Sequence, residues 1–279
     1  MAFVLTLDAQ EFNDRAGDFL ADQMECNVLA TVLMNALAGR YRNVRSVFGY
    51  QLAAGGAVTG AVMRTPPHAL LASPVAADEI EPLLDAWLRL DPDLNGVNGP
   101  PETARSLTQA WVARTGGRAG LAREMAMHSL RRVARPPRPA AGRLRLGRPR
   151  ERELLIDWWQ AFVEQAGGHG GGEAAANVEA RLANGSLFVW DQGGPVSLVA
   201  MSPPVDGVVR IGPVYTPPEQ RRHGYAGTAV AEVSRRALAA GARACMLLTD
   251  LANPTSNKIY AEVGFQRFAD WEEYEFRSD

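Results

Sequence analysis

Cysteine, histidine and lysine are scarce in this chain of 279 residues. The two cysteines, Cys26 and Cys245, have neither metal-ligand spacing nor the pattern of a disulfide framework, so we expect both to be reduced and buried. Lys258 is the only lysine, which in a chain rich in arginine, alanine and glycine reflects genomic codon composition more than function. The net charge of −2 leaves no electrostatic footprint for nucleic acid.

Long apolar runs are also missing. No uninterrupted apolar stretch is long enough to cross a bilayer, and residues 1–12 lack the basic start and apolar core of a signal peptide. We therefore expect a cytoplasmic protein that binds neither membrane nor nucleic acid. The length suits two domains of ordinary size.

The most informative segment is residues 214–230, in which a strand breaks on prolines and leads through residues 221–226 into an alanine-rich helix. A glycine-bearing turn before a helix presents unpaired backbone N–H groups, and the helix dipole adds partial positive charge to them. Such a turn can hold a phosphate or pyrophosphate. The nucleotide loops Gly-x-x-x-x-Gly-Lys-Ser/Thr and Gly-x-Gly-x-x-Gly do not occur there, and a plain strand-to-helix connection is the alternative.

The strand at residues 208–215 carries Gly212 and Pro213 in its middle. Proline cannot donate to a sheet ladder, and an interior glycine often marks a bulge or a close approach to a ligand. We predict that this strand is locally unpaired on one side. An edge strand with an incidental Gly-Pro pair is the alternative.

A short helix with both ends marked follows the apolar run at residues 244–250. Asn253 suits the N-cap, Pro254 the first helical position and Gly264 the position after the last turn. These residues predict a helix of two to three turns.

Taken together, these segments resemble the GNAT acetyltransferase superfamily. Arg221-x-x-Gly224-x-Ala226 matches the acyl-CoA pyrophosphate loop of this family, Gln/Arg-x-x-Gly-x-Gly/Ala. In the family, the strand before that loop splays from its neighbour and admits the pantetheine arm of CoA. The helix matches the family pattern at Asn253, Ser256, Tyr260, Gly264 and Phe265. The resemblance implies acetyl-CoA as the acyl donor, bound by Val214, Tyr215, Thr216, Arg221, Arg222, His223, Gly224, Tyr225, Ala226, Gly227, Asn253 and Ser256.

The residue types suit acyl transfer from a thioester to an amine. A positioned phenol can protonate the departing thiolate, which makes Tyr260 the candidate general acid; packing of the helix onto the sheet is its alternative role. The family places the oxyanion donor at a backbone N–H near Val214. The candidates for the general base are Asp250, Glu164 and Tyr215, and the spacing singles out none of them. Asp250 fits the role of a structural carboxylate better than that of a base. No metal is expected.

Three prolines and a glycine in residues 133–142 predict an extended connector between two domains, 1–134 and 143–279. The order of elements after it is that of a GNAT fold, an α+β, αβα sandwich. The first half is either a degenerate GNAT-like lobe, as in two-lobed glycine N-acyltransferase-like proteins, or an unrelated α+β domain. We expect first-half helices at residues 19–38, 78–90 and 101–115, strands at 46–52, 57–63 and 69–73, and an extended segment at 122–133. In the second half we expect strands at 143–146, 186–190, 196–201, 208–215 and 244–250, and helices at 151–165, 173–183 and 254–263.

These observations predict an acyl-CoA-dependent N-acetyltransferase that acts on a primary amine of a small molecule by direct attack. The run His169-Gly-Gly-Gly is similar to the oxyanion-hole motif of some α/β-hydrolases, but the chain has no Gly-x-Ser-x-Gly elbow to support that activity. In the fold that the chain resembles, this loop borders the acceptor site, which makes His169 a candidate for binding the amine. The alternatives are a non-catalytic acyl-CoA-binding or assembly module and a protein or peptide N-acetyltransferase. The sequence leaves open whether the protein forms a homodimer.

Overall fold

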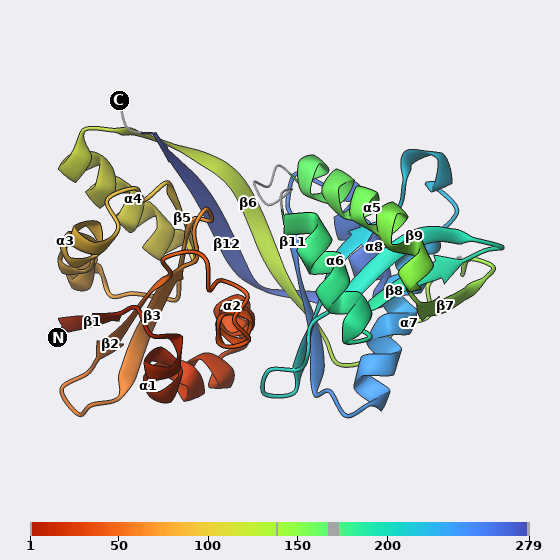
Figure 1. Cartoon of the computed structure of the whole chain (residues 1–279), viewed down its shortest axis with the longest axis horizontal. Coiled ribbons are helices and arrows are strands. Elements are labelled where there is room, and N and C mark those ends of the chain that lie inside the picture. Colours follow the sequence, from red (N-terminus) through yellow and green to blue (C-terminus); the bar gives the residue numbers. More distant parts are fainter. Residues whose placement is uncertain (1, 138, 167–172, 278–279) are drawn as a thin grey trace. The chain divides into compact units, whose positions relative to one another are not determined.

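The computed structural model describes residues 2–137, 139–166 and 173–277, and it divides into two compact units (Figure 1). The N-terminal unit runs to Met127 and also includes Asp250–Ala252 and the chain from Ala269 on. The C-terminal unit comprises His128–Thr249 and Asn253–Phe268.

Helices and strands follow one another in the same order in the two halves of the chain. The first half contains β1 (Ala2–Thr6), α1 (Ala9–Asp22), α2 (Asn27–Leu37), β2 (Val47–Leu52), β3 (Val58–Arg64), β4 (Leu70–Ala72), α3 (Ile80–Leu90), β5 (Gly96–Gly99), α4 (Pro101–Thr115) and β6 (Arg118–Leu130). The second half contains β7 (Arg143–Leu146), α5 (Arg152–Gln165), α6 (Ala174–Ala183), β8 (Leu187–Asp191), β9 (Pro195–Met201), β10 (Val208–Tyr215), α7 (Tyr225–Ala239), β11 (Ala244–Asp250), α8 (Pro254–Val263) and β12 (Gln266–Arg277).

Strand pairing repeats as well. In the first half β1 to β4 form antiparallel neighbours and β4 pairs with β5 in parallel; in the second half β7 to β10 are antiparallel and β10 pairs with β11 in parallel. This repeated topology confirms the predicted fold class, with a GNAT-like arrangement in each half.

The last strand of each half of the chain lies next to a strand of the other half. The strand next to β5 is β12, and the strand next to β11 is β6. Both strands are long enough to belong to the two units, with Ala269 onward in the N-terminal unit and His128–Leu130 in the C-terminal one. The predicted division into 1–134 and 143–279 therefore differs from the structure at the end of the chain, because the second part of β12 completes the sheet of the N-terminal unit.

Side chains of β12 pack and form polar contacts within the N-terminal unit. Phe276 stacks on Trp111 of α4 with ring centroids 4.4 Å apart, and Trp271 donates its indole N–H to Asn98 of β5. Glu272 and Glu273 form ion pairs with Arg105 and Arg123. In the same unit, Trp87 and Leu83 of α3 are fully buried, in the apolar cluster that also contains Trp111 and Phe276.

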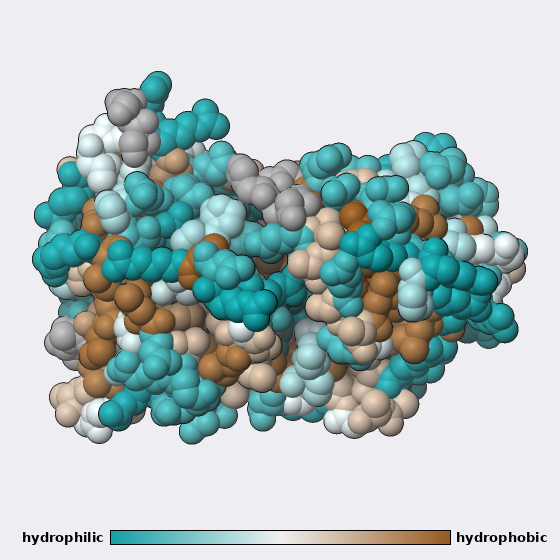
Figure 2. Space-filling model, viewed as in Figure 1, coloured by the Kyte–Doolittle hydropathy of each residue, from teal (hydrophilic) through white to brown (hydrophobic). Residues whose placement is uncertain are grey.

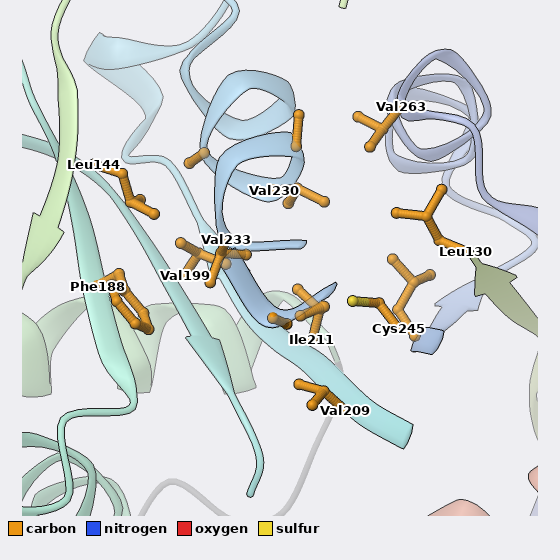
Figure 3. Close-up of a cluster of buried hydrophobic side chains, with 14 of the residues drawn as sticks. Leu130, Leu144, Phe188, Val199, Val209, Ile211, Val230, Val233, Cys245 and Val263 are labelled. Carbon is orange, nitrogen blue, oxygen red and sulfur yellow. The ribbon is translucent and has the colours of Figure 1, made fainter. Parts of the chain in front are cut away.

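The sheet of the C-terminal unit is covered on both faces. On one face, α7 and α8 pack over a cluster that includes Val199, Val230 and Val263 (Figure 3). On the other, α5 and α6 pack over Leu198 and its neighbours. Val199 and Leu198 are adjacent in β9, and their side chains point to opposite faces, as strand geometry requires.

Most elements predicted from the sequence are confirmed, within one or two residues at their ends. The helix predicted at 19–38 is wrong in extent, because the chain breaks at residues 23–26 and α1 starts earlier, where Asp8 accepts the N–H groups of Gln10 and Glu11. Strands β1 and β5 were not predicted. The sequence of β5, Gly-Val-Asn-Gly, favours a turn, but a side chain at Gly96 would overlap the carbonyl oxygen of Tyr274 in β12.

Among the described residues, no helix is long and apolar enough to cross a membrane. Hydrophilic residues cover much of the face drawn in Figure 2.

Candidate functional site

Strands β10 and β11 separate toward their carboxyl ends. Their pairing ends with Arg210 opposite Met246, although β10 runs on to Tyr215 and β11 to Asp250. On the other side β10 bulges against β9, because the register shifts between Ile211 and Val214. Gly212 lies in this bulge with φ at +141°, a backbone conformation that L side chains rarely adopt. The predicted local loss of pairing is confirmed.

The connection from β10 to α7 forms a cradle of backbone N–H groups. Arg222 and Gly224 both have left-handed backbone conformations, with φ at +68° and +79°. For Arg222, which has a Cβ, this conformation costs on the order of 1–3 kcal/mol, so its surroundings must hold it. Within the described chain, the N–H groups of Arg222, His223 and Gly224 have no hydrogen-bond acceptor, and no side chain caps α7.

The first N–H groups of α7, at Tyr225, Ala226 and Gly227, also lack an acceptor because they precede the first full helical turn. A Cβ at Gly227 would make an ordinary van der Waals contact with Ile259 of α8, at 3.4 Å. The start of α7 is therefore close-packed against α8.

Side chains around the loop have partners within the protein. Arg221 donates from Nε to the carbonyl oxygen of Thr216 (2.9 Å) and from Nη2 to Oε1 of Gln165 (2.8 Å). His223 stacks on Tyr225, with ring centroids 5.4 Å apart and an angle of 18° between the rings. Arg221 thus turns its guanidinium toward the protein.

At the end of β10, Tyr215 is buried and its ring packs against Trp158 of α5. Thr216 has its hydroxyl 2.9 Å from that of Ser197, while Val214 is half-buried and pairs with Val199. Tyr215 contributes to the core next to the cradle, and its ring is a poor candidate for a base because it is enclosed by apolar side chains.

Helix α8 has the predicted ends. The side chain of Asn253 accepts the N–H of Ser256 at 3.0 Å, and Gly264 ends the helix with φ at +105°. Asn253 is exposed and Ser256 half-buried.

Tyr260 lies on α8 with its ring edge-on to Phe265, the centroids 6.1 Å apart. It packs on the apolar cluster of the C-terminal unit, and burial raises the pKa of its phenol to about 12. Its hydroxyl makes no hydrogen bond to any part of the chain that the structure describes. A protonated phenol with a free donor is therefore available on this helix.

The remaining candidates are separate from this arrangement or bound elsewhere. Asp250 accepts the N–H of Ala252 at 2.7 Å, which makes it a turn-forming carboxylate, and Glu164 is exposed. His169 lies outside the described residues. Burial raises the pKa of Cys26 to about 12 and that of Cys245 to about 11, so neither thiol is reactive at neutral pH. No metal-binding cluster of His, Cys, Asp or Glu occurs among the described residues.

Two residues of this region were not predicted. Ser197 is fully buried below Tyr215 and Thr216, and Gln165 is the last residue of α5. Neither lies in a recognisable motif, and each meets the loop only through the fold, so no local pattern could have indicated them.

A family model matches part of the second half of the chain. Residues 152–265 match the model of the acetyltransferase (GNAT) family, so the chain carries a GNAT domain. No curated protein matches the chain.

Solved structures extend the likeness to the whole chain. A GNAT-family acetyltransferase from Colwellia psychrerythraea aligns over 100% of both chains, with a TM-score of 0.60 and 9% identity. A Drosophila protein aligns over 99% of both chains, with a TM-score of 0.65 and 14% identity. A GCN5-related N-acetyltransferase from Sphaerobacter thermophilus aligns over 98% of this chain and 95% of its own, with a TM-score of 0.56 and 15% identity. At these identities the likeness shows a shared fold.

GNAT acetyltransferases use acetyl-CoA, and the local structure fits this donor. A diphosphate needs several convergent N–H groups, which the left-handed residues and the uncapped start of α7 supply. The opening between β10 and β11 exposes strand edges that can hydrogen-bond to the amides of pantetheine. The matched domain and the local geometry are consistent with acyl-CoA-dependent acyl transfer.

Proposed function

We propose that the protein transfers an acetyl or other short acyl group from acetyl-CoA to a primary amine of a small molecule, by direct attack and without a covalent enzyme intermediate. The observation that carries this proposal is the presence of three features in one unit: separated β10 and β11, a helix start with free N–H groups, and an unpartnered phenol on α8.

The cradle of N–H groups from Arg222 to Gly227 binds the pyrophosphate of CoA. Asn253 and Ser256 add side-chain oxygen and hydroxyl groups on the neighbouring helix, while Asn253 also caps it. A backbone N–H near Val214 stabilises negative charge on the thioester oxygen, since the pairing of β10 with β11 ends at Arg210 and leaves this edge of β10 open. Acetyl-CoA supplies the activated acyl group.

Tyr260 donates a proton to the sulfur that leaves. Its raised pKa keeps the phenol protonated at neutral pH, so the donor is always present, and the absence of a competing acceptor among the described residues leaves it free. The amine loses its own proton through water, because neither Asp250 nor Glu164 has a geometry that marks it as a base.

The experiment compares wild type with Tyr260→Phe, using thiol release from acetyl-CoA against a panel of small amines and short peptides with free N-termini. Loss of a general acid lowers turnover roughly 100- to 10,000-fold, while acetyl-CoA binding measured by calorimetry stays within a few-fold of wild type. Tyr274→Phe, on β12, is the matched control and keeps full turnover.

Each result assigns a function. Unchanged turnover in Tyr260→Phe removes Tyr260 from the mechanism. Binding of acetyl-CoA without thiol release on any amine favours the non-catalytic module, and release only with peptides favours a peptide N-acetyltransferase.

A further inference from the structure

A line of hydrogen bonds runs from the core of the C-terminal unit to the surface through the loop after β10. Ser197, fully buried on β9, donates its hydroxyl to the carbonyl oxygen of Tyr215 (3.0 Å) and lies 2.9 Å from the hydroxyl of Thr216. The carbonyl oxygen of Thr216 accepts Nε of Arg221, whose Nη2 donates to Gln165. The loop is thus linked to β9 at one end and to α5 at the other.

These contacts act on the conformation of the cradle together with the backbone hydrogen bonds of the loop itself, from Gln220 to Pro217 and from Arg221 to Pro218. The planar guanidinium of Arg221 carries donors in a rigid fork, so two acceptors on different elements fix its orientation. The bond to Thr216 closes the segment 216–221 into a ring, and the next residue, Arg222, has the strained left-handed conformation. The directions of the free N–H groups at Arg222, His223 and Gly224 therefore depend on where Arg221 is held.

We propose that Arg221 is a positioning residue, and that Gln165 at the end of α5 sets the affinity for acetyl-CoA by holding it. The proposal rests on the proposed function, in which the cradle binds the pyrophosphate. The side chain of Arg221 acts through the shape of the loop, and the backbone N–H groups make the contacts with phosphate. Gln165 has no charge and bonds only to the guanidinium in the contacts described above, so its effect on binding must pass through Arg221.

The test measures acetyl-CoA binding to the full chain by calorimetry. Gln165→Ala frees one arm of the guanidinium, and we expect the dissociation constant to rise roughly 2- to 12-fold, the range for an ordinary net hydrogen bond, because both side chains are exposed. Gln160→Ala is the matched control, an exposed glutamine on the same helix with no side-chain partner among the described residues, and binds as wild type does. Gln165→Glu keeps an acceptor for the guanidinium and restores most of the affinity.

A double-mutant cycle separates positioning from direct binding. Arg221→Lys keeps a positive charge but loses the fork, so it weakens binding at least as much as Gln165→Ala, and combining the two changes adds nothing. Thermal midpoints of all variants stay at the wild-type value, because both side chains are exposed.

Two results overturn the proposal: Gln165→Ala binding acetyl-CoA as tightly as Gln160→Ala does, or fully additive effects of the changes at Gln165 and Arg221. Absence of acetyl-CoA binding by the wild-type protein overturns the proposed function itself, and this outcome is distinct from the other two.

Discussion

Phe276 lies close to the end of the sequence, where side chains usually contribute little, yet it is part of a core. Its ring is buried and stacks on Trp111 with centroids 4.4 Å apart and 17° between the planes. Replacing a buried phenylalanine by alanine costs about 3–5 kcal/mol, of which the aromatic pair accounts for about 0.5–1.5 kcal/mol. We therefore expect Phe276→Ala to destabilise the N-terminal unit by about 3–5 kcal/mol.

Amide hydrogen exchange followed by mass spectrometry locates the loss. Protection should fall in β5, which pairs with β12 from Glu272 to Glu275, and in α4, which carries Trp111. Urea unfolding gives the total change in free energy. Arg277→Ala is the matched control because the side chain next to Phe276 is mostly exposed, and it should change stability by no more than about 0.5 kcal/mol.

A loss below about 1 kcal/mol, or exchange that rises only at the last residues of β12, would refute this reasoning. Either result would mean that the N-terminal unit holds its sheet without the second part of β12, and the exchange of strands would then be a minor feature of the fold.

Three further predictions concern the loop, the phenol and the exchanged strand. Gly224→Ala places a side chain at φ +79° in the cradle and raises the dissociation constant for acetyl-CoA at least tenfold by calorimetry, whereas Gly193→Ala, at the same φ in the β8–β9 turn, leaves binding unchanged. Burial raises the pKa of Tyr260 from 10.0 to about 12. The phenol therefore adds no pH dependence to the stability below pH 10.0, and it lowers the free energy of unfolding as the pH rises from 10.0 to about 12. Urea unfolding across this range should show a shallower fall in Tyr260→Phe than in the wild type. A chain that ends at Phe268 loses exchange protection in β5, and a peptide of residues 269–279 added in excess restores it; protection that survives truncation would contradict this.

Local features of the fold were predictable because their causes are local. Asn253 and Gly264 mark the ends of α8 through capping and left-handed geometry, and Gly212-Pro213 breaks the ladder of β10 through a missing donor. The exchange of β6 and β12 was not predictable in this way. Both are extended strands, and which partner each selects depends on contacts between residues far apart in the sequence, such as Phe276 with Trp111.

The backbone of the candidate site could be predicted better than its side chains. The positions of the N–H groups follow from a strand, a glycine and a helix start, which the sequence shows directly. The orientation of Arg221 depends on Gln165, which is distant in sequence, and on the carbonyl oxygen of Thr216, and no motif includes these contacts. Arg221 was predicted to bind the cofactor; its guanidinium in the structure is bonded to the protein.

The first half shows what the site requires beyond the fold, since it has the same topology and different local chemistry. Strands β4 and β5 remain close to the end of β4: a Cβ on Gly99 would lie 3.0 Å from the carbonyl oxygen of Ala72. The turn that leads into α3 carries Asp78 and Glu79, whose carboxylates repel phosphate where the second half offers free N–H groups. A closed pair of strands and an acidic helix start therefore disfavour acyl-CoA binding in the N-terminal unit, and introducing such a site would require both an opening after β4 and a neutral turn before α3.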